Sequence, residues 1–308
     1  SSAASDVYKR QVKGGAVNSV SCLVRASSFI VDTDGNQLPY INRYSVEAKS
    51  HNLVPIAAAN GAITMQPFNI YIQFYTYLMA QREVGDYEVY HWYNSGASDW
   101  TIRPNLNKHI NPKDPRTEKK WILLNDVRFR KALSLAINRQ QIIDAVFSGF
   151  GEPAQATPGK ESPFYYEKLR KNYIKYDPDR ANELLDELGL IGRDTEGYRT
   201  FDDGTRMVWY LDLIPNSLGP SPFVVEDWKS VCLNTIERMH SYNSIQGASR
   251  TNDFSVGALG GSFHPLAGPW YYVPGTYSAA GYHQWYSSGG LFDNPKALKR
   301  GSIEPPLN

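Results

Sequence analysis

The sequence predicts an α/β fold in which helices and strands alternate along the second half of the chain. Capped, amphipathic helical patterns occur at residues 125–149 and 177–189. Apolar runs rich in β-branched and aromatic residues predict strands at residues 207–214 and 254–258. A further helical pattern at residues 221–239 separates these two strands. Such alternation is typical of a lobe built on a mixed or parallel sheet.

The bulk composition is that of an ordinary globular protein. The chain has 308 residues, of which 42% are hydrophobic and 20% charged, so there is room for one large or two medium domains. Because 32 Lys and Arg balance 31 Asp and Glu, we expect no nucleic-acid partner. No apolar run is long enough for a membrane span, and the first residues lack the apolar segment of a signal peptide. Cys22 and Cys232 are either buried thiols or a disulfide, and the sequence leaves both readings open.

The first third of the chain carries weaker signals. Residues 1–28 stay unassigned, because the opening SSAASDVYKRQ is typical of vector-derived or read-through sequence. A tight turn at residues 34–36 (DGN) predicts a hairpin within residues 31–43, since Gly and Asn tolerate positive φ. Alternating patterns predict strands at residues 87–92 and 101–107, and a polar loop is expected at residues 111–120.

Two helices are predicted between residues 125 and 149. Asn125 is the expected N-cap of the first, and Asn138 with Gln141 three residues later forms a capping-box variant for the second. Gly149 is expected to end the second helix. The expected buried positions are Val127, Leu133 and Ala136 on the first helix and Ile142, Ile143, Val146 and Phe147 on the second.

Two more helices and a hairpin are predicted farther along. Asp177-Pro178 starts one helix, and Gly189 ends it. A turn at residues 202–204 (DDG) leads into the strand at 207–214. Ser221-Pro222 starts the next helix. The expected inward positions are Ala181, Leu184, Leu185 and Leu188 on the first helix and Val224, Val225, Trp228, Val231, Cys232, Ile236 and Met239 on the second.

An uncharged aromatic segment follows the last predicted strand. The 39 residues between Asp253 and Asp293 contain no Asp, Glu, Lys or Arg, although the average of the chain would place about eight there. The segment is rich in Trp, Tyr and Phe, interleaved with Gly and Pro. Rings presented from loops favour a neutral ligand, such as a sugar or an uncharged peptide backbone, because a charged group would find no partner. A buried aromatic core is the alternative.

Several strings resemble one known family. LNDVRFRKALSLAINRQQIIDAVFSGFG at residues 124–151 and YDPDRANELLDELG at 176–189 are similar to the extracellular solute-binding proteins, family 5, of bacterial ABC transporters. DGNQLPYINR at 34–43 also matches, with Asn42 where Asp is usual. The resemblance covers about residues 29–306 and implies a strand–turn element at 59–66.

The resemblance implies a periplasmic-binding-protein-like type II fold, with two lobes that have mixed sheets and are joined by a hinge. The chain would then hold only part of the first lobe. We expect partial lobe one at residues 29–103 and lobe two at residues 104–308, truncated before its return to lobe one. The strand at residues 101–107 is the expected hinge.

The resemblance also suggests ligand contacts in the aromatic segment. Peptide-binding members carry an acidic residue at the position of Gly261. Its absence here favours an oligosaccharide over an oligopeptide as the ligand. Trp270-Tyr271 and the string WYSSGG from Trp285 look like cleft segments of oligosaccharide-binding members. The predicted ligand-binding residues are Gly260, Gly261, Ser262, His264, Trp270, Tyr271, Tyr272, Trp285 and Tyr286.

The function implied is the substrate-binding component of an ABC importer. It would capture an oligosaccharide or oligopeptide and deliver it to a permease and its ATPase, in the periplasm or outside the cell, with membrane association through the transporter. No catalytic motif, metal-ligand spacing or cofactor signature is found, so we expect no enzyme and no cofactor. The alternative is a carbohydrate-active enzyme or carbohydrate-binding module that uses the same aromatic segment.

Overall fold

The computed structural model divides into two compact units, Ser1–Tyr90 and His91–Asn308. This division lies upstream of the boundary expected at residues 103–104. The structure describes residues 19–23, 31–38, 40–41, 43–50, 52–66, 70, 72–90, 98–157, 160, 165–214, 219–241, 252–259 and 285.

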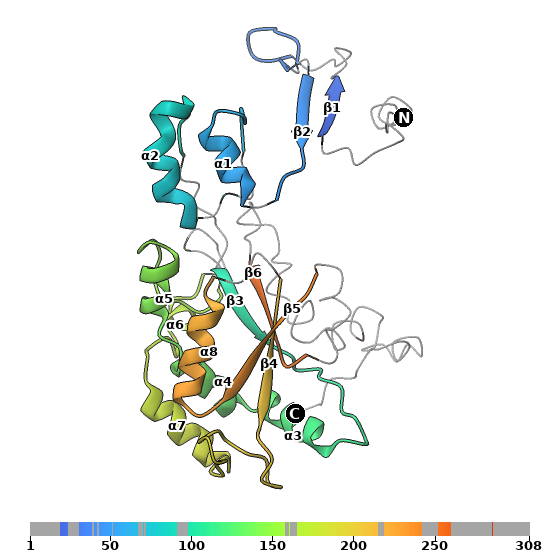
Figure 1. Cartoon of the computed structure of the whole chain (residues 1–308), viewed down its shortest axis with the longest axis vertical. Coiled ribbons are helices and arrows are strands. Elements are labelled where there is room, and N and C mark those ends of the chain that lie inside the picture. Colours follow the sequence, from blue (N-terminus) through green and yellow to red (C-terminus); the bar gives the residue numbers. More distant parts are fainter. Residues whose placement is uncertain are drawn as a thin grey trace. The chain divides into compact units, whose positions relative to one another are not determined.

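The first unit contains a two-stranded antiparallel sheet and two helices (Figure 1). Strand β1 (Ser19–Leu23) pairs with β2 (Arg43–Glu47), so the stretch left unassigned from the sequence supplies a strand. Helix α1 (Leu53–Ala59) is followed by a short 3₁₀ turn, η2 (Ile72–Phe74), and by α2 (Tyr75–Gly85).

The predicted turn at residues 34–36 is confirmed. Gly35 has a φ of +81°, and the amide of Asp32 donates to the carbonyl of Asn36 at 3.0 Å. Two other expectations for this unit are wrong. Residues 60–66 form no strand, because α1 runs to Ala59 and a turn follows. Residues 87–90 are irregular; residues 91–92 of that predicted strand lie outside the described part.

A four-stranded mixed sheet organises the second unit, as the sequence predicts. Its order is β3 (Ser98–Pro104), β6 (Phe254–Leu259), β4 (Val208–Leu213) and β5 (Asn234–Met239). Strand β3 is antiparallel to β6, whereas β4 is parallel to both β5 and β6. The carboxyl ends of these three parallel strands therefore point toward the same edge of the sheet.

Six helices are described in this unit: α3 (Pro115–Asn125), α4 (Val127–Leu135), α5 (Arg139–Val146), α6 (Glu167–Arg170), α7 (Pro178–Glu187) and α8 (Ser221–Ser230). The polar loop expected at residues 111–120 is wrong from Pro115 onward. Asp114 caps α3 by accepting a hydrogen bond from the amide of Arg116 at 3.2 Å. The start of α7 predicted from the same Asp-Pro signal at Asp177 is confirmed, because the Asp177 side chain accepts from the amide of Arg180.

The helix pair is present, but the expected cap of its first member is wrong by one residue. Asp126, not Asn125, caps α4, and it accepts from the amide of Arg128 at 2.8 Å. Val127 consequently lies on the solvent side, 50% exposed, while Phe129 is buried. The second cap is confirmed, because Asn138 accepts from the amide of the predicted partner Gln141 at 3.2 Å.

The long helix expected at residues 221–239 is two elements. Helix α8 ends at Ser230, and the chain turns at Cys232, whose φ is +65°, before it continues as β5. Ile236 and Met239, expected to face the core from a helix, instead lie on this strand and are 44% and 49% exposed. Cys232 is a free, half-buried thiol.

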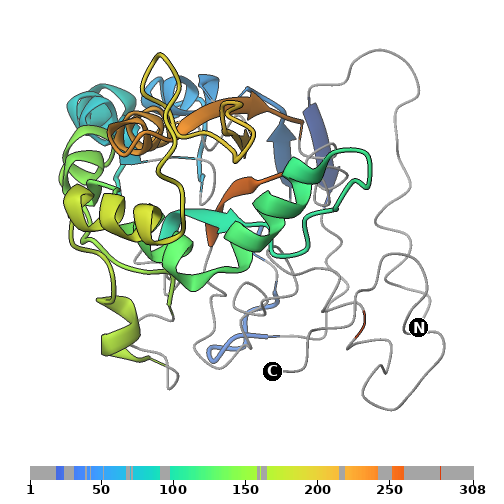
Figure 2. The ribbon, with the colours of Figure 1, turned by 90° about the horizontal axis from the view of Figure 1, so that it is seen from below.

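The core lies between the sheet and helices α4, α7 and α8, which Figures 1 and 2 show on one side of the strands. Aromatic rings from four elements, α4, β4, β6 and α8, meet at its centre. The ring centroid of Trp209 is 4.9 Å from Phe129 and 5.5 Å from Phe254, and Phe254 is 5.1 Å from Trp228. These rings bury the sheet face opposite the polar residues of the candidate site, since successive strand residues point to opposite faces.

Candidate functional site

Polar side chains gather on the second face of the sheet. On β4, Trp209 and Leu211 point into the core, so Tyr210 and Asp212 point the other way. Asp212 lies opposite Ser255 of β6 on one side and Arg238 of β5 on the other. Helices α4, α7 and α8 pack on the opposite face, and this face carries polar side chains.

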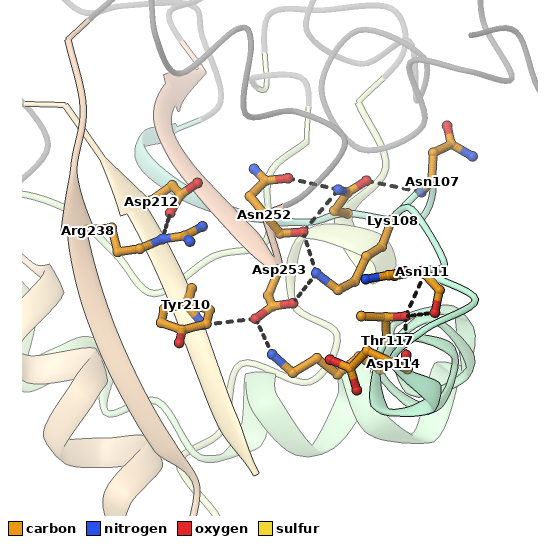
Figure 3. A network of polar contacts seen from close by, with 12 residues as sticks. Asn107, Lys108, Asn111, Asp114, Thr117, Tyr210, Asp212, Arg238, Asn252 and Asp253 are labelled. Carbon is orange, nitrogen blue, oxygen red and sulfur yellow. Dashed lines mark hydrogen bonds and ion pairs between the residues drawn. The ribbon is translucent and has the colours of Figure 1, made fainter.

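A buried carboxylate stands immediately before β6. Asp253 is fully buried, and its Oδ1 lies 2.7 Å from Nζ of Lys108. Its Oδ2 accepts from Nζ of Lys120 at 2.7 Å and from the backbone amide of Tyr210 at 3.0 Å. Figure 3 shows Asp253 between Lys108 and Tyr210. Breaking a buried ion pair costs about 3–5 kcal/mol, so this carboxylate strongly links helix α3, strand β4 and the loop after β3 to the start of β6.

Lys120 reaches this carboxylate from helix α3. Burial lowers the pKa of Lys120, and the charge and hydrogen bond of Asp253 act in the opposite direction. The ammonium also lies 5.1 Å from the ring centroid of Trp209 and 5.2 Å from that of Tyr210. The aromatic faces and the carboxylate together replace the water that the charged group loses.

A second set of bonds joins the end of β3 to the start of β6. Nδ2 of Asn105 donates to Oδ1 of Asn252 at 2.8 Å and to its carbonyl oxygen at 3.0 Å. The amide of Asn105 donates to the carbonyl of Asp253 at 2.9 Å. Asn252 and Asp253, which precede β6, are thus bonded to Asn105 through both side-chain and backbone atoms.

A second buried carboxylate lies near the carboxyl ends of β4 and β5. Asp212 accepts from Nε of Arg238 at 2.7 Å, and Nε2 of His240 is 3.3 Å from the same oxygen. The guanidinium of Arg238 stacks over the ring of Tyr210 at 4.3 Å. Ligands of open α/β sheets bind beyond the carboxyl ends of the strands, so this edge is the one expected to face a ligand.

The predicted ligand-binding residues begin one position after β6 ends. Of that set, Trp285 alone lies among the described residues, and it is buried, with 9% of its surface exposed. The others, which lie outside the described residues, are Gly260, Gly261, Ser262, His264, Trp270, Tyr271, Tyr272 and Tyr286. Strand β6 is therefore the described element that leads into the predicted site.

The polar residues of the sheet were not singled out from the sequence. One signal was present, because a charged residue in the middle of the apolar run VWYLDL is a buried charge and needs a partner. No sequence signal marks Lys108 or Lys120, since each stands in a stretch of ordinary polar composition. Among the described residues, no three His, Cys, Asp or Glu side chains are grouped as a metal site.

Comparison with known proteins decides the family. A model of the bacterial extracellular solute-binding proteins, family 5 (middle region), matches residues 60–278, which is more than half of the chain. The chain belongs to this family. The resemblance noted in the sequence is confirmed, as is the α/β fold with a mixed sheet of the periplasmic-binding-protein-like type.

Three known proteins to which the chain is similar follow. The structure of an oligopeptide-binding protein, OppA, is 28% identical, with a TM-score of 0.61, and the match covers 94% of this chain and 47% of that one. The periplasmic binding protein MelB of Agrobacterium fabrum C58, in complex with stachyose, is 17% identical with a TM-score of 0.63, covering 80% and 38%. A probable ABC transporter-binding protein of Deinococcus radiodurans is 30% identical over 91 residues, 29% of this chain and 15% of that protein.

Membership places this solute-binding chain with proteins that act outside the cytoplasm. The chain spans less than half the length of these relatives. Of the helices that the structure describes, none combines the length and the apolar character that crossing a bilayer requires.

Proposed function

We propose that this solute-binding protein is the substrate-binding component of an ABC importer and captures a neutral oligosaccharide or oligopeptide on residues 260–286. The observation that supports this most is the course of β6. This strand leaves a buried, heavily tied polar network and runs directly into the uncharged aromatic segment, beyond the carboxyl edge of the parallel strands. That edge is where open α/β sheets bind ligands.

An oligosaccharide is the favoured ligand class. Gly260, Gly261 and Ser262 offer no carboxylate to a peptide ammonium group, whereas the aromatic rings that follow suit the flat faces of sugars. The similarity to a protein solved with stachyose supports this choice. Because the chain is also similar to an oligopeptide-binding protein, a peptide is included among the ligands to be tested.

Capture is proposed to use closure of two lobes about a hinge, with a permease and an ATPase as partners. A ligand that turns a mostly open population into a mostly closed one must favour the closed form by roughly 5 kcal/mol. Several ring contacts and hydrogen bonds supply energy of that order. The lobe boundary at residues 103–104 and the hinge at residues 101–107 remain predictions.

Calorimetric titration of the chain with stachyose and with a mixed-sequence nonapeptide tests the proposal. We expect saturable binding of stachyose, a change in tryptophan fluorescence, and intact ligand recovered by chromatography after prolonged incubation. Hydrolysis that disappears on changing a single Asp or Glu would favour a carbohydrate-active enzyme instead. Absence of binding to both probes, with the protein folded, would count against either ligand class.

A further inference from the structure

The central strand β6 is weakly paired on one side. It shares five registered residue pairs with β3, and β4 shares six with β5, but β6 and β4 share only two, Leu211 with Phe254 and Asp212 with Ser255. Two pairs provide little resistance to a shift of one strand along the other. Something beyond the ladder is therefore needed to fix β6 against β4.

The side chain of Asp253 supplies the missing tie. In place of a backbone carbonyl, Oδ2 of Asp253 accepts from the amide of Tyr210, one position before the first registered pair. Lys108, from the loop that follows β3, and Lys120, from α3, each place Nζ 2.7 Å from the same carboxylate. The carboxylate is fully buried, so water does not compete for these bonds.

We propose that Asp253 is a positioning residue that fixes the register of β6 against β4, and with it the point at which the chain leaves the sheet toward Gly260. A slip of one residue would move Phe254 and Val256 from the core to the polar face and turn Ser255 into the core. The consequence for ligand affinity rests on the proposed function, whereas the effect on the strand does not.

Three variants separate the role of this side chain from its contribution to stability. Asp253→Ala removes both the charge and the acceptor for Tyr210. Asp253→Asn removes the charge but keeps an oxygen that accepts the same backbone bond. Asp212→Asn is the matched control, since Asp212 is also fully buried and paired with a cation, Arg238, but accepts from no backbone amide of the described residues.

Amide hydrogen exchange in the unliganded chain is the primary measurement, with β6 compared with β5 inside each variant. We expect Asp253→Ala to raise exchange of β6 at least tenfold relative to β5, and Asp253→Asn to raise it less than threefold even though it lowers the global stability. Asp212→Asn should leave the ratio of β6 exchange to β5 exchange at the wild-type value, or lower it because β5 exchanges faster. If the ratio of β6 exchange to β5 exchange were the same in Asp253→Ala as in the wild type, the proposal would be overturned.

A variant that avoids unpaired buried lysines covers the case in which Asp253→Ala does not fold. Asp253→Ala with Lys108→Met and Lys120→Met removes the whole charge set, and the proposal requires the same loss of β6 protection. If this variant protects β6 as the wild type does, the backbone ladder alone sets the register and the proposal is wrong.

Affinity for stachyose, or for the nonapeptide if only that probe binds, is the second measurement. We expect at least a tenfold loss in Asp253→Ala and less than a threefold loss in Asp253→Asn and Asp212→Asn, all at temperatures where each variant is folded. A wild type that binds neither probe would contradict the proposed function and leave the exchange result to decide the role of Asp253. Normal affinity in an Asp253→Ala protein with exposed β6 would refute the link to the ligand.

Discussion

At the scale of single residues, one buried arginine ties together three segments of the second unit. The side chain of Arg199 is fully buried, and its Nε donates to the carbonyl of Val231 at 3.0 Å. One terminal nitrogen pairs with Asp186 at 2.6 Å and donates to the carbonyl of Leu190, and the other donates to Oδ1 of Asn182 at 2.8 Å. The planar guanidinium uses its fork of donors in a way that an ammonium group cannot reproduce.

Substitution of this arginine should therefore be costly even by lysine. We expect Arg199→Lys to lower the free energy of unfolding by about 2–4 kcal/mol, because buried acceptors lose their donors. Arg180→Lys is the control, since Arg180 pairs with Glu183 and Glu187 at the surface and should change stability by less than about 0.5 kcal/mol. Urea denaturation followed by circular dichroism measures both. Equal effects of the two substitutions would mean that the buried network contributes little.

Residue-level prediction from the sequence succeeded where one local signal stood alone and failed where two competed. Asn138 had no rival as a cap, and the structure confirms it. Asn125 and Asp126 were both acceptable caps, and the choice depended on α3, whose end at Asn125 the sequence did not reveal. The side-chain Nδ2 of Asn125 instead donates to the carbonyls of Leu106 and Trp121.

At the scale of elements, the errors have tertiary causes. After Pro115, helix α3 continues with the polar run RTEKK, so its large apolar residues, WILL, appear only in about its last turn. Helix α8 and strand β5 happen to place apolar residues at helical spacing across the turn at Cys232, and the pairing of β5 with β4 overrides that pattern. Strand β1 needed its partner β2 to be recognised, because pairing is not local in sequence.

The cap of α5 offers a test at this scale. Asn138→Ala removes the side-chain acceptor of the Gln141 amide, and we expect a loss of about 1 kcal/mol in the free energy of unfolding. Asn138→Ser keeps a capping oxygen and should recover most of this loss. Both variants keep the backbone amide that donates to Asp227 at 2.8 Å, so that bond is common to the pair. Thermal or urea unfolding of the two variants measures the difference in stability. An alanine variant as stable as the serine variant would contradict the role of the cap.

At the scale of the whole molecule, the sequence predicted the fold class, the mixed sheet and the family, because helix periodicity and local strings carry that information. It did not predict the polar network around Asp253, since Lys108, Lys120 and Tyr210 come together only through tertiary packing. The predicted ligand-binding residues begin in the sequence directly after β6. They remain a prediction, and Trp285 is the one of them that the structure describes.

The central claim is that the uncharged aromatic segment after β6 contacts the ligand. Amide hydrogen exchange of the chain with and without saturating stachyose, or the nonapeptide if that is the probe that binds, tests it most directly. The account predicts that the bound ligand slows exchange mainly within residues 260–286 and the carboxyl end of β6. A bound probe that slows exchange only on helices α4, α7 and α8, and leaves residues 260–286 unchanged, would contradict it.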